Sequence, residues 1–365
     1  MYLKHLSLLN FKNIAQAQFD FSSGINGLVG DNGAGKSNVL DAIYYLSMCK
    51  SMLQLTDGQS VLHGEDFFVA DGSYKSRDKR IDVVSCTFSK QKSAGKIMKR
   101  NGKEYERLAD HVGFVPIVVV SPYDSVLISD SAEERRRFIN QLISQFDANY
   151  LNALIRYNAL LLQRNKVLKS GADESMLALY DEQMMPYAKT LEKVRRESVE
   201  ELLPLVCSYY EVLSGGRESV EISYKTQLSD EVSFVELMQQ SRQRDIVNGF
   251  SSAGVHRDDL LFTIDDGKPL RKFGSQGQQK SFLVALKLAQ YQLMSRVKGE
   301  HPILLLDDLF DKLDRGRVEQ LIRLVSGDDF GQIFISDCNR ERLQLVLDKA
   351  DTKYSIFNIE KGAVV

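Results

Sequence analysis

The sequence predicts an α/β fold into which a lobe of long helices is inserted. A short apolar strand at residues 25–29 leads into a glycine-rich loop and then a helix with 3.6-residue periodicity. A second apolar strand, residues 303–306, ends in two aspartates, and long amphipathic helices occupy residues 131–210 between the two strands. Buried apolar strands that alternate with helices are typical of an α/β core.

Composition indicates a folded protein of two or three domains without a strong bulk charge. The chain has 365 residues, 43% of them hydrophobic, and a net charge of -2, so nucleic acid would have to bind a local basic patch. The four cysteines stand singly, and neither a signal peptide nor an apolar run of about 20 residues is present. We therefore expect a soluble protein of the cytoplasm, without a disulfide framework or a transition-metal site.

The expected elements follow in order along the chain. Residues 1–21 alternate like a hairpin, and residues 66–103, with an Asn101-Gly102 turn, predict an antiparallel meander. Ser131 with Glu134 predicts a capping box at the start of the helical lobe. After residue 251 we expect a strand, an Asp266-Gly267 turn, a helix at 278–297 and strands at 303–306 and 332–336. The predicted domains are 1–125 with 246–365, a discontinuous α/β domain, and 126–245, the helical insert.

The glycine-rich loop matches the P-loop pattern GxxxxGK[ST] and is flanked by the strand and helix that this motif requires. Its glycines let backbone amides approach a phosphate, Lys36 would reach the β- and γ-phosphates, and Ser37 would bind Mg²⁺. A simple glycine turn is the alternative, and the flanking elements argue against it. The candidate nucleotide-binding residues are Gly30, Asp31, Asn32, Gly33, Ala34, Gly35, Lys36, Ser37 and Asn38.

The strand at 303–306 delivers Asp307 and Asp308 to the end of a buried strand. Alone, this pattern is more typical of a solvated acidic turn. Together with the P-loop, Asp307 can hold Mg²⁺ directly or through water, and Asp308 can orient or deprotonate the attacking water. Lys36 and Asp307 stand about 270 residues apart, which disfavours a compact kinase or GTPase.

With the polar segment Ser275 to Gln279 placed before the acidic strand, the chain resembles the ABC-type ATPases of the SMC-like branch, and within them the RecF family. Taken alone, that segment also fits an ordinary polar helix start. The resemblance extends over nearly the whole chain. It is carried by LSLLNFKN from Leu6, GDNGAGKSNVLDAIYYLS from Gly30, SPYDSVLISDSAEERRRFIN from Ser121, GVHRDDL from Gly254, FGSQGQQKSFLVALKLAQ from Phe273, and LLLDDLFDKLD from Leu304.

The resemblance implies an ATP-dependent homodimer that clamps duplex DNA at gaps or single-strand/double-strand junctions and releases it on slow hydrolysis. Ser275, Gly277 and Gln278 would contact the γ-phosphate held by the other subunit, and a helix start of this kind is a natural anion site. Lys12 would approach the phosphates, and Asp314 would lie on the dimer-facing loop. The cofactors implied are ATP and Mg²⁺, and the partners are DNA, RecR and RecO.

Several positions differ from the family pattern. Asp308 stands where the superfamily often has glutamate, and no histidine follows His301, so Ser336 and Asp337 stand where a switch histidine is usual. Val255, Tyr123 and the pair Asp311-Lys312 also replace expected residues. The residue that senses the γ-phosphate is left open.

Two basic segments are candidates for DNA contact. Arg135, Arg136 and Arg137 would bind phosphates or pair with Glu133 and Glu134, and the second interpretation is favoured because three consecutive helical residues cannot face one way. A second set, in the predicted meander, has equal claims as a phosphate-tracking hairpin and as a solvated surface. It comprises Lys90, Lys92, Lys96, Lys99, Arg100 and Lys103.

Two other functions remain as alternatives, and a third segment has a structural interpretation. An ATPase subunit of a membrane transporter shares the nucleotide chemistry, but the long helical insert counts against it. A small-molecule kinase or an ATPase-linked nuclease is less favoured, because no further acidic metal cluster is evident. His256, Arg257 and Asp258 favour a structural ion-pair network over catalysis.

Overall fold

The computed structural model describes residues 1–76, 78–91, 95–171, 173–228, 232–308, 315–350 and 353–364. The chain divides into two compact units, Met1–Asp124 with Leu283–Val365, and Ser125–Phe282. The division after Asp124 lies next to the expected boundary at residue 125. The second division follows Phe282, whereas the expected boundary lies between residues 245 and 246. One reason is that the strand at 259–264 pairs with the strand at 220–225, on the other side of that boundary.

The first unit contains an antiparallel sheet of order β2-β1-β4-β5-β6-β7. The predicted hairpin and meander are both confirmed within it. Asn101 and Gly102, which join β6 to β7, have φ values of 50° and 79°, the left-handed conformation of a tight hairpin turn. The strands are β1 (Tyr2–Phe11), β2 (Ile14–Asp20), β4 (Phe67–Lys75), β5 (Ile81–Ser89), β6 (Lys96–Arg100) and β7 (Lys103–Glu104).

The second sheet of this unit has the order β15-β14-β3-β13-β12-β8 and is parallel except for β15. Its central strands are buried throughout, as their largely apolar sequences predict. Because β3, β13 and β12 run in the same direction, Val29, Ser336 and Asp307 reach the same edge of the sheet. The strands are β3 (Ile25–Val29), β8 (Ile117–Val120), β12 (Ile303–Leu306), β13 (Ile333–Asp337), β14 (Tyr354–Glu360) and β15 (Ala363–Val364).

Helix α1 (Lys36–Met48) is buried along almost its whole length. It shares one hydrophobic core with residues of both sheets, such as Leu6 and Phe68 of the first and Leu305 and Phe334 of the second. This packing fixes the start of α1 at the carboxyl edge of the parallel strands. Shorter helices complete the unit: η1 (Asp57–Ser60), η2 (Leu108–Asp110), η3 (Pro122–Ser125), α9 (Arg315–Val325) and α10 (Arg340–Lys349).

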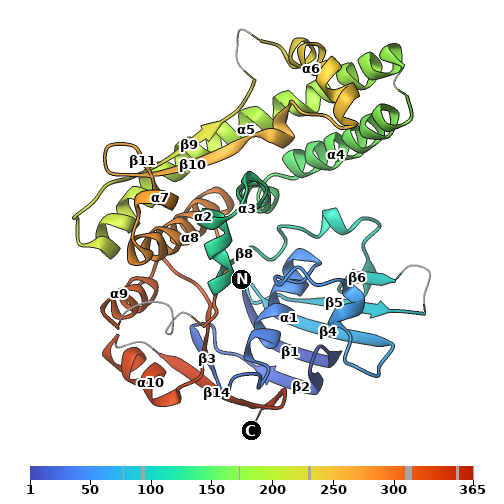
Figure 1. Cartoon of the computed structure of the whole chain (residues 1–365). Helices are drawn as coiled ribbons and strands as arrows, with labels where there is room; N and C mark the ends of the chain where they lie inside the picture. Colours follow the sequence, from blue (N-terminus) through green and yellow to red (C-terminus); the bar gives the residue numbers. More distant parts are fainter. Residues whose placement is uncertain are drawn as a thin grey trace. The chain divides into compact units, whose positions relative to one another are not determined.

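The second unit is built on long helices, as predicted, and on a three-stranded antiparallel sheet of order β11-β10-β9. Figure 1 shows α4 and α5 side by side, with β9 and β10 running along α5. Helix α8 (Gln276–Lys298) begins in this unit and ends in the first. The other elements are α2 (Val126–Ser129), α3 (Ala132–Ser144), α4 (Ala148–Lys169), α5 (Glu174–Ser214), β9 (Val220–Lys225), α6 (Phe234–Asn248), η4 (Val255–Arg257), β10 (Asp259–Ile264), β11 (Lys268–Pro269) and α7 (Leu270–Phe273).

A fully buried arginine joins three helices of this unit. The guanidinium of Arg164 on α4 donates to Asp181 of α5 over 2.7 Å and to Asp245 of α6 over 2.9 Å. It also donates to the hydroxyl of Ser251 over 2.7 Å. All three charged side chains are 0% exposed, so each depends on its partners for the solvation it has lost.

A second buried network holds the segment before β10. Arg195 of α5 donates to the carbonyl of Val255 over 2.7 Å and to Asp258 over 3.1 Å. The ring of His256 contacts the hydroxyl of Tyr157 at 2.8 Å, and burial lowers the pKa of His256 to about 4. The expected structural ion-pair network is found at Asp258, whereas His256 and Arg257 contact neutral partners, the hydroxyl of Tyr157 and the carbonyl of Ser251.

Candidate nucleotide-binding site

The glycine-rich loop connects β3 to α1, and the predicted strand and helix on either side of it are confirmed. Gly30 has a φ of 155°, and a Cβ there would lie 2.2 Å from the carbonyl oxygen of Ile359. Gly35, which caps the start of α1, has a φ of 113°. Both positions therefore require glycine, one for space and one for its left-handed backbone.

The loop and the start of α1 present groups that suit an anion. Among the described residues, no side chain caps the first amides of α1, and the positive end of the helix dipole lies there. The buried ammonium of Lys36 donates to the carbonyls of Gly30, over 2.8 Å, and Asp31, over 3.0 Å. These contacts hold the cation inside the curve of the loop, where free amides and positive charge can act on the same phosphate.

The turn between β1 and β2 contributes Asn13, which the sequence analysis did not identify. Its side-chain amide donates to the carbonyl of Gly33 over 3.2 Å, and its oxygen accepts from Asn38 over 2.7 Å. Asn13 therefore ties the loop to the first turn of α1. The only sequence signal was its place beside Lys12 in the segment FKN.

Lys12, which we expected near the phosphates, forms an ion pair with Asp41 of α1. The lysine side chain is 7% exposed and the aspartate 0%, so the pair is part of the packing between α1 and the first sheet. Asp41 also accepts from the hydroxyl of Ser51 over 2.7 Å. These contacts give Lys12 a structural partner of its own beside the loop.

The acidic end of β12 lies against the first turn of α1. The hydroxyl of Ser37 donates to Oδ1 of Asp307 over 2.9 Å, although the two residues are 270 positions apart. Burial raises the pKa of Asp307, while hydrogen bonds from Ser336 and Ser37 act in the opposite direction. The predicted convergence of the two motifs is found at this contact.

This set of groups fits a nucleotide carried by Mg²⁺. A hydroxyl and a carboxylate within hydrogen-bond distance are oxygen donors of the kind that Mg²⁺ prefers. Lys36 and the uncapped amides of α1 lie on the same loop and suit phosphate oxygens. Asp308, next to Asp307, extends the acidic side of the site by one residue.

Ser275, Gly277 and Gln278 lie in the second unit, at the start of α8. The hydroxyl of Ser275 accepts from the amide of Gln278 over 3.3 Å, and the Gln278 side chain accepts from the amide of Ser275 over 2.6 Å. This reciprocal pair is the arrangement of a capped helix start. Their contact with a nucleotide remains a proposal.

The three consecutive arginines of α3 have partners inside the second unit. Arg135 pairs with Asp259 over 2.7 Å, and Arg136 donates to the carbonyl of Asp258 over 2.7 Å. Arg137 pairs with Glu134 over 2.8 Å. The expected pairing with Glu133 and Glu134 is therefore found for Arg137 alone, whereas Arg135 and Arg136 contact Asp259 and Asp258 instead.

The basic meander is also largely engaged within its own unit. Lys96 pairs with Asp57 over 2.9 Å, Arg100 pairs with Asp82 over 3.0 Å, and Lys90 donates to the carbonyl of Glu65 over 2.8 Å. Lys99 and Lys103 are exposed. Lys92 lies outside the described residues, as do Asp314 and the pair Asp311-Lys312.

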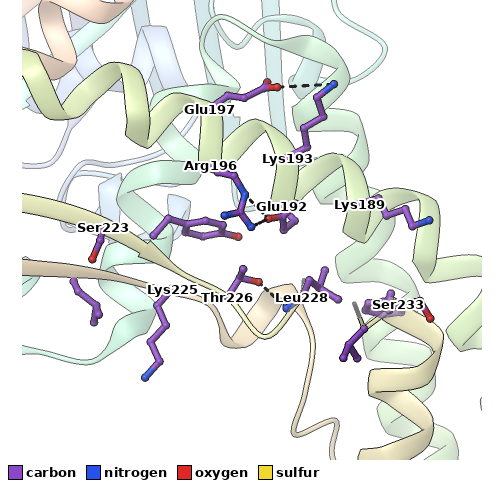
Figure 2. A pocket seen from close by; sticks show the side chains of 14 residues that line it. Lys189, Glu192, Lys193, Arg196, Glu197, Ser223, Lys225, Thr226, Leu228 and Ser233 are labelled. Carbon is purple, nitrogen blue, oxygen red and sulfur yellow. Dashed lines mark hydrogen bonds and ion pairs between the residues drawn. The ribbon is translucent and has the colours of Figure 1, made fainter. Parts of the chain in front are cut away.

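The second unit carries a groove of about 1070 Å³ between α5, β9 and the start of α6. Figure 2 shows that acids of α5 contact two of its basic side chains, in the pairs Arg196 with Glu192 and Lys193 with Glu197. Lys189 and Lys225 add further positive charge to the lining. Because charges of both signs line it, the groove lacks the uniform positive surface that a nucleic-acid backbone prefers.

Within the described part of the chain, no helix combines the length and the apolar character that are needed to cross a bilayer.

The first part of the chain matches a known family model. The model is described as the RecF/RecN/SMC N terminal domain, and it matches residues 2–110. This range contains the glycine-rich loop, α1 and the whole first sheet.

Relatives match the chain over its full length. The chain is 45% identical to the DNA replication and repair protein RecF of Bacteroides thetaiotaomicron, over 100% of this chain and 98% of the relative. It is 43% identical to the protein of the same name from Flavobacterium johnsoniae, over 98% of this chain and 100% of the relative.

Solved structures of similar proteins agree with the fold. A structure of the recombination mediator protein RecF with ATP, in the RecFOR pathway, is 28% identical with a TM-score of 0.89, over 100% of this chain and 97% of that one. An Smc head domain from Pyrococcus furiosus is 17% identical with a TM-score of 0.59, over 100% of this chain and 95% of that one. The Smc likeness shows the fold alone, and it agrees with the predicted ABC-type ATPase class.

Proposed function

This chain belongs to the RecF family of DNA replication and repair proteins, and from that premise we propose that it is an ATP-switched DNA-binding protein. In this proposal ATP binding brings two copies together and lets them hold duplex DNA at gaps or single-strand/double-strand junctions. Slow ATP hydrolysis then releases the DNA. The protein would act in the cytoplasm, at the nucleoid.

The observation that carries the proposal is the contact between Ser37 and Asp307. Two side chains 270 positions apart meet at 2.9 Å, next to a loop that only glycine can form at two of its positions. A relative of similar fold, 28% identical, was solved with ATP. The contact places a hydroxyl and a carboxylate together, and Mg²⁺ bound to a nucleotide takes oxygen ligands of this kind from a protein.

Each residue of the site has a definite role in this proposal. When bound, Mg²⁺ supplies charge that neutralises the developing negative charge on the phosphates. Ser37 and Asp307 would hold that cation, and Lys36 with the amides of Gly30 to Asn38 would hold the triphosphate. Asp308 would orient or deprotonate the attacking water.

A second copy of the chain completes the site in this proposal. Ser275, Gly277 and Gln278 would contact the γ-phosphate from that copy, as the start of a helix suits an anion. The functional division into 1–125 with 246–365, and 126–245, remains part of the proposal, because it keeps the Ser275 segment with the ATPase part. RecR and RecO are proposed partners, since similar proteins act in the RecFOR pathway.

The transporter alternative differs in its partner. An ATPase subunit of a transporter would drive a membrane protein, whereas relatives at up to 45% identity over the full chain are named for DNA replication and repair. Family membership therefore favours DNA as the partner that the nucleotide controls.

A DNA-binding titration tests this function. Duplex, single-stranded and gapped DNA are titrated with the full chain in the presence of ATP, ADP or no nucleotide, at one stated salt concentration, because phosphate contacts weaken steeply with salt. We expect the ATP state to bind gapped or duplex DNA at least about tenfold more tightly than the ADP state, a change of about 1.4 kcal/mol. Equal affinities in all three nucleotide states would contradict the switch.

A further inference from the structure

The hydroxyl of Ser336 lies between the two acids at the end of β12. It donates to Oδ1 of Asp307 over 2.6 Å and accepts from the backbone amide of Asp308 over 2.9 Å. Its distance to Oδ1 of Asp308 is 3.3 Å, so the shorter contact, with Asp307, takes its single proton. One side chain on the neighbouring strand therefore forms hydrogen bonds with both acidic residues.

The amide contact bears on the backbone of Asp308. This residue has a φ of 45°, in the left-handed region that residues with a Cβ adopt at a cost. A hydrogen bond from its amide to the fully buried Ser336 offsets that cost and fixes the direction in which the chain leaves β12. The position of the Asp308 side chain depends on this turn.

The carboxylate contact bears on Asp307. Ser336 and Ser37 both donate to the same oxygen, Oδ1, over 2.6 Å and 2.9 Å. Two donors from different elements, β13 and α1, prevent the carboxylate from rotating freely about its last bond. Partners of this kind, behind a ligand, orient the ligand and tune its affinity for the metal.

We infer that Ser336 is a positioning residue for ATP hydrolysis. Its single hydroxyl fixes the Asp307 carboxylate and the Asp308 backbone relative to each other. The inference rests on the proposed function, because it assigns to this hydroxyl the geometry of the Mg²⁺ ligand and of the water-orienting acid. Ser336 acts through these two residues and not on the nucleotide. Binding of ATP by the loop and Lys36 is therefore independent of it.

The test compares threonine and valine at position 336, since the two side chains have the same shape and differ in the hydroxyl. Ser336→Thr keeps the donor and acceptor, whereas Ser336→Val removes both at the same cost in packing. We expect the valine variant to lose about 10- to 100-fold in kcat. The dissociation constant for ATP should stay within about threefold of the wild type in both variants, and the threonine variant should retain kcat within about threefold.

Steady-state hydrolysis and equilibrium ATP binding are measured on the full chain, with thermal melting to establish that each variant is folded. Ser336→Ala, which removes the hydroxyl without adding volume, replaces the valine variant if that one does not fold. Equal loss of kcat in the threonine and valine variants would assign the effect to packing and overturn the inference. Wild-type kcat in the valine or alanine variant would overturn it as well.

The wild-type measurements separate this inference from the function on which it rests. If the wild type neither binds nor hydrolyses ATP, the proposed function fails and the inference fails with it. If the wild type hydrolyses ATP and the hydroxyl-free variants do so equally fast, only the role of Ser336 is refuted.

Discussion

Asp308 is the residue proposed to orient the attacking water. Its side chain is one carbon shorter than that of a glutamate, and its backbone φ of 45° sets where that side chain points. Slow hydrolysis remains part of the proposal, since the short side chain limits how closely the carboxylate can approach the water.

Asp308→Asn tests this role at the scale of one residue. The amide keeps the size of the side chain and cannot accept a proton, so we expect turnover to fall about 100-fold or more. ATP binding should be unchanged, because Lys36 and the loop amides bind the phosphates. Single-turnover hydrolysis and equilibrium ATP binding measure the two effects, and wild-type turnover in the variant would remove Asp308 from the mechanism.

The sequence predicted the residues of the glycine-rich loop better than the residues that surround the loop. Gly30, Gly35 and Lys36 follow from a motif because their chemistry needs particular atoms at fixed spacing, and the loop geometry agrees with that expectation. Lys12 and Asn13 are adjacent in sequence, and only the turn between β1 and β2 decides that the asparagine touches the loop while the lysine pairs with Asp41. No local pattern contains that information.

At the scale of elements, the helices of the second unit are connected by buried charges. Arg164 links α4, α5 and α6 through Asp181 and Asp245. Removing the arginine would leave two carboxylates out of water without their shared cation, although Arg242 still contacts Asp181 over 3.0 Å.

Arg164→Met should therefore lower the free energy of unfolding by about 3–5 kcal/mol. The matched control is Arg196→Met on α5, because Arg196 is 47% exposed and pairs with Glu192 within the same helix. We expect the control to cost less than about 1 kcal/mol. Urea unfolding of both variants measures the difference, and similar stability losses in the two would contradict the assignment of this network as a structural clamp.

Hydrophobic periodicity predicted most elements, because the pattern of buried side chains in each element is visible in its own stretch of sequence. The strands at 25–29 and 303–306 and the helix of α8 all have such patterns. Strand β9 and helix α6 were not predicted. Strand β9 is short and stands at the edge of its sheet, and its partner β10 follows only after α6, so the pairing that defines it is not local. The same pairing keeps the chain up to Ile264 in the second unit, beyond the expected boundary.

At the scale of the whole molecule, family membership was predicted from the sequence and is confirmed by relatives up to 45% identical over the full chain. The motifs that carried the resemblance are spread from Leu6 to Asp314. The resemblance therefore concerns nearly the whole chain and not one domain. The contacts between two copies could not be predicted in the same way. They depend on how two surfaces pair, and no local sequence pattern encodes that pairing.

Ser275→Arg tests the proposed dimer. An arginine at the start of α8 would place a bulky side chain where the γ-phosphate of the other copy is proposed to dock. We expect ATP-induced dimerisation to be lost, while ATP binding by the single copy is retained, since Ser275 lies outside the P-loop. Light scattering with and without ATP measures the change, with Ser275→Ala as the variant of small volume. A dimer that survives the arginine would contradict the sandwich arrangement.

We propose that the loop from Gly30 to Ser37 binds the phosphates of ATP, and equilibrium ATP binding to the wild type and to Lys36→Ala is the direct test. Loss of a hydrogen bond from a charged group costs about 1.5–3 kcal/mol, so we predict that ATP affinity falls at least about tenfold in the variant. Thermal melting of the variant without nucleotide serves as the control for folding. Unchanged ATP affinity in a folded Lys36→Ala protein would show that the loop does not bind the phosphates of ATP through Lys36.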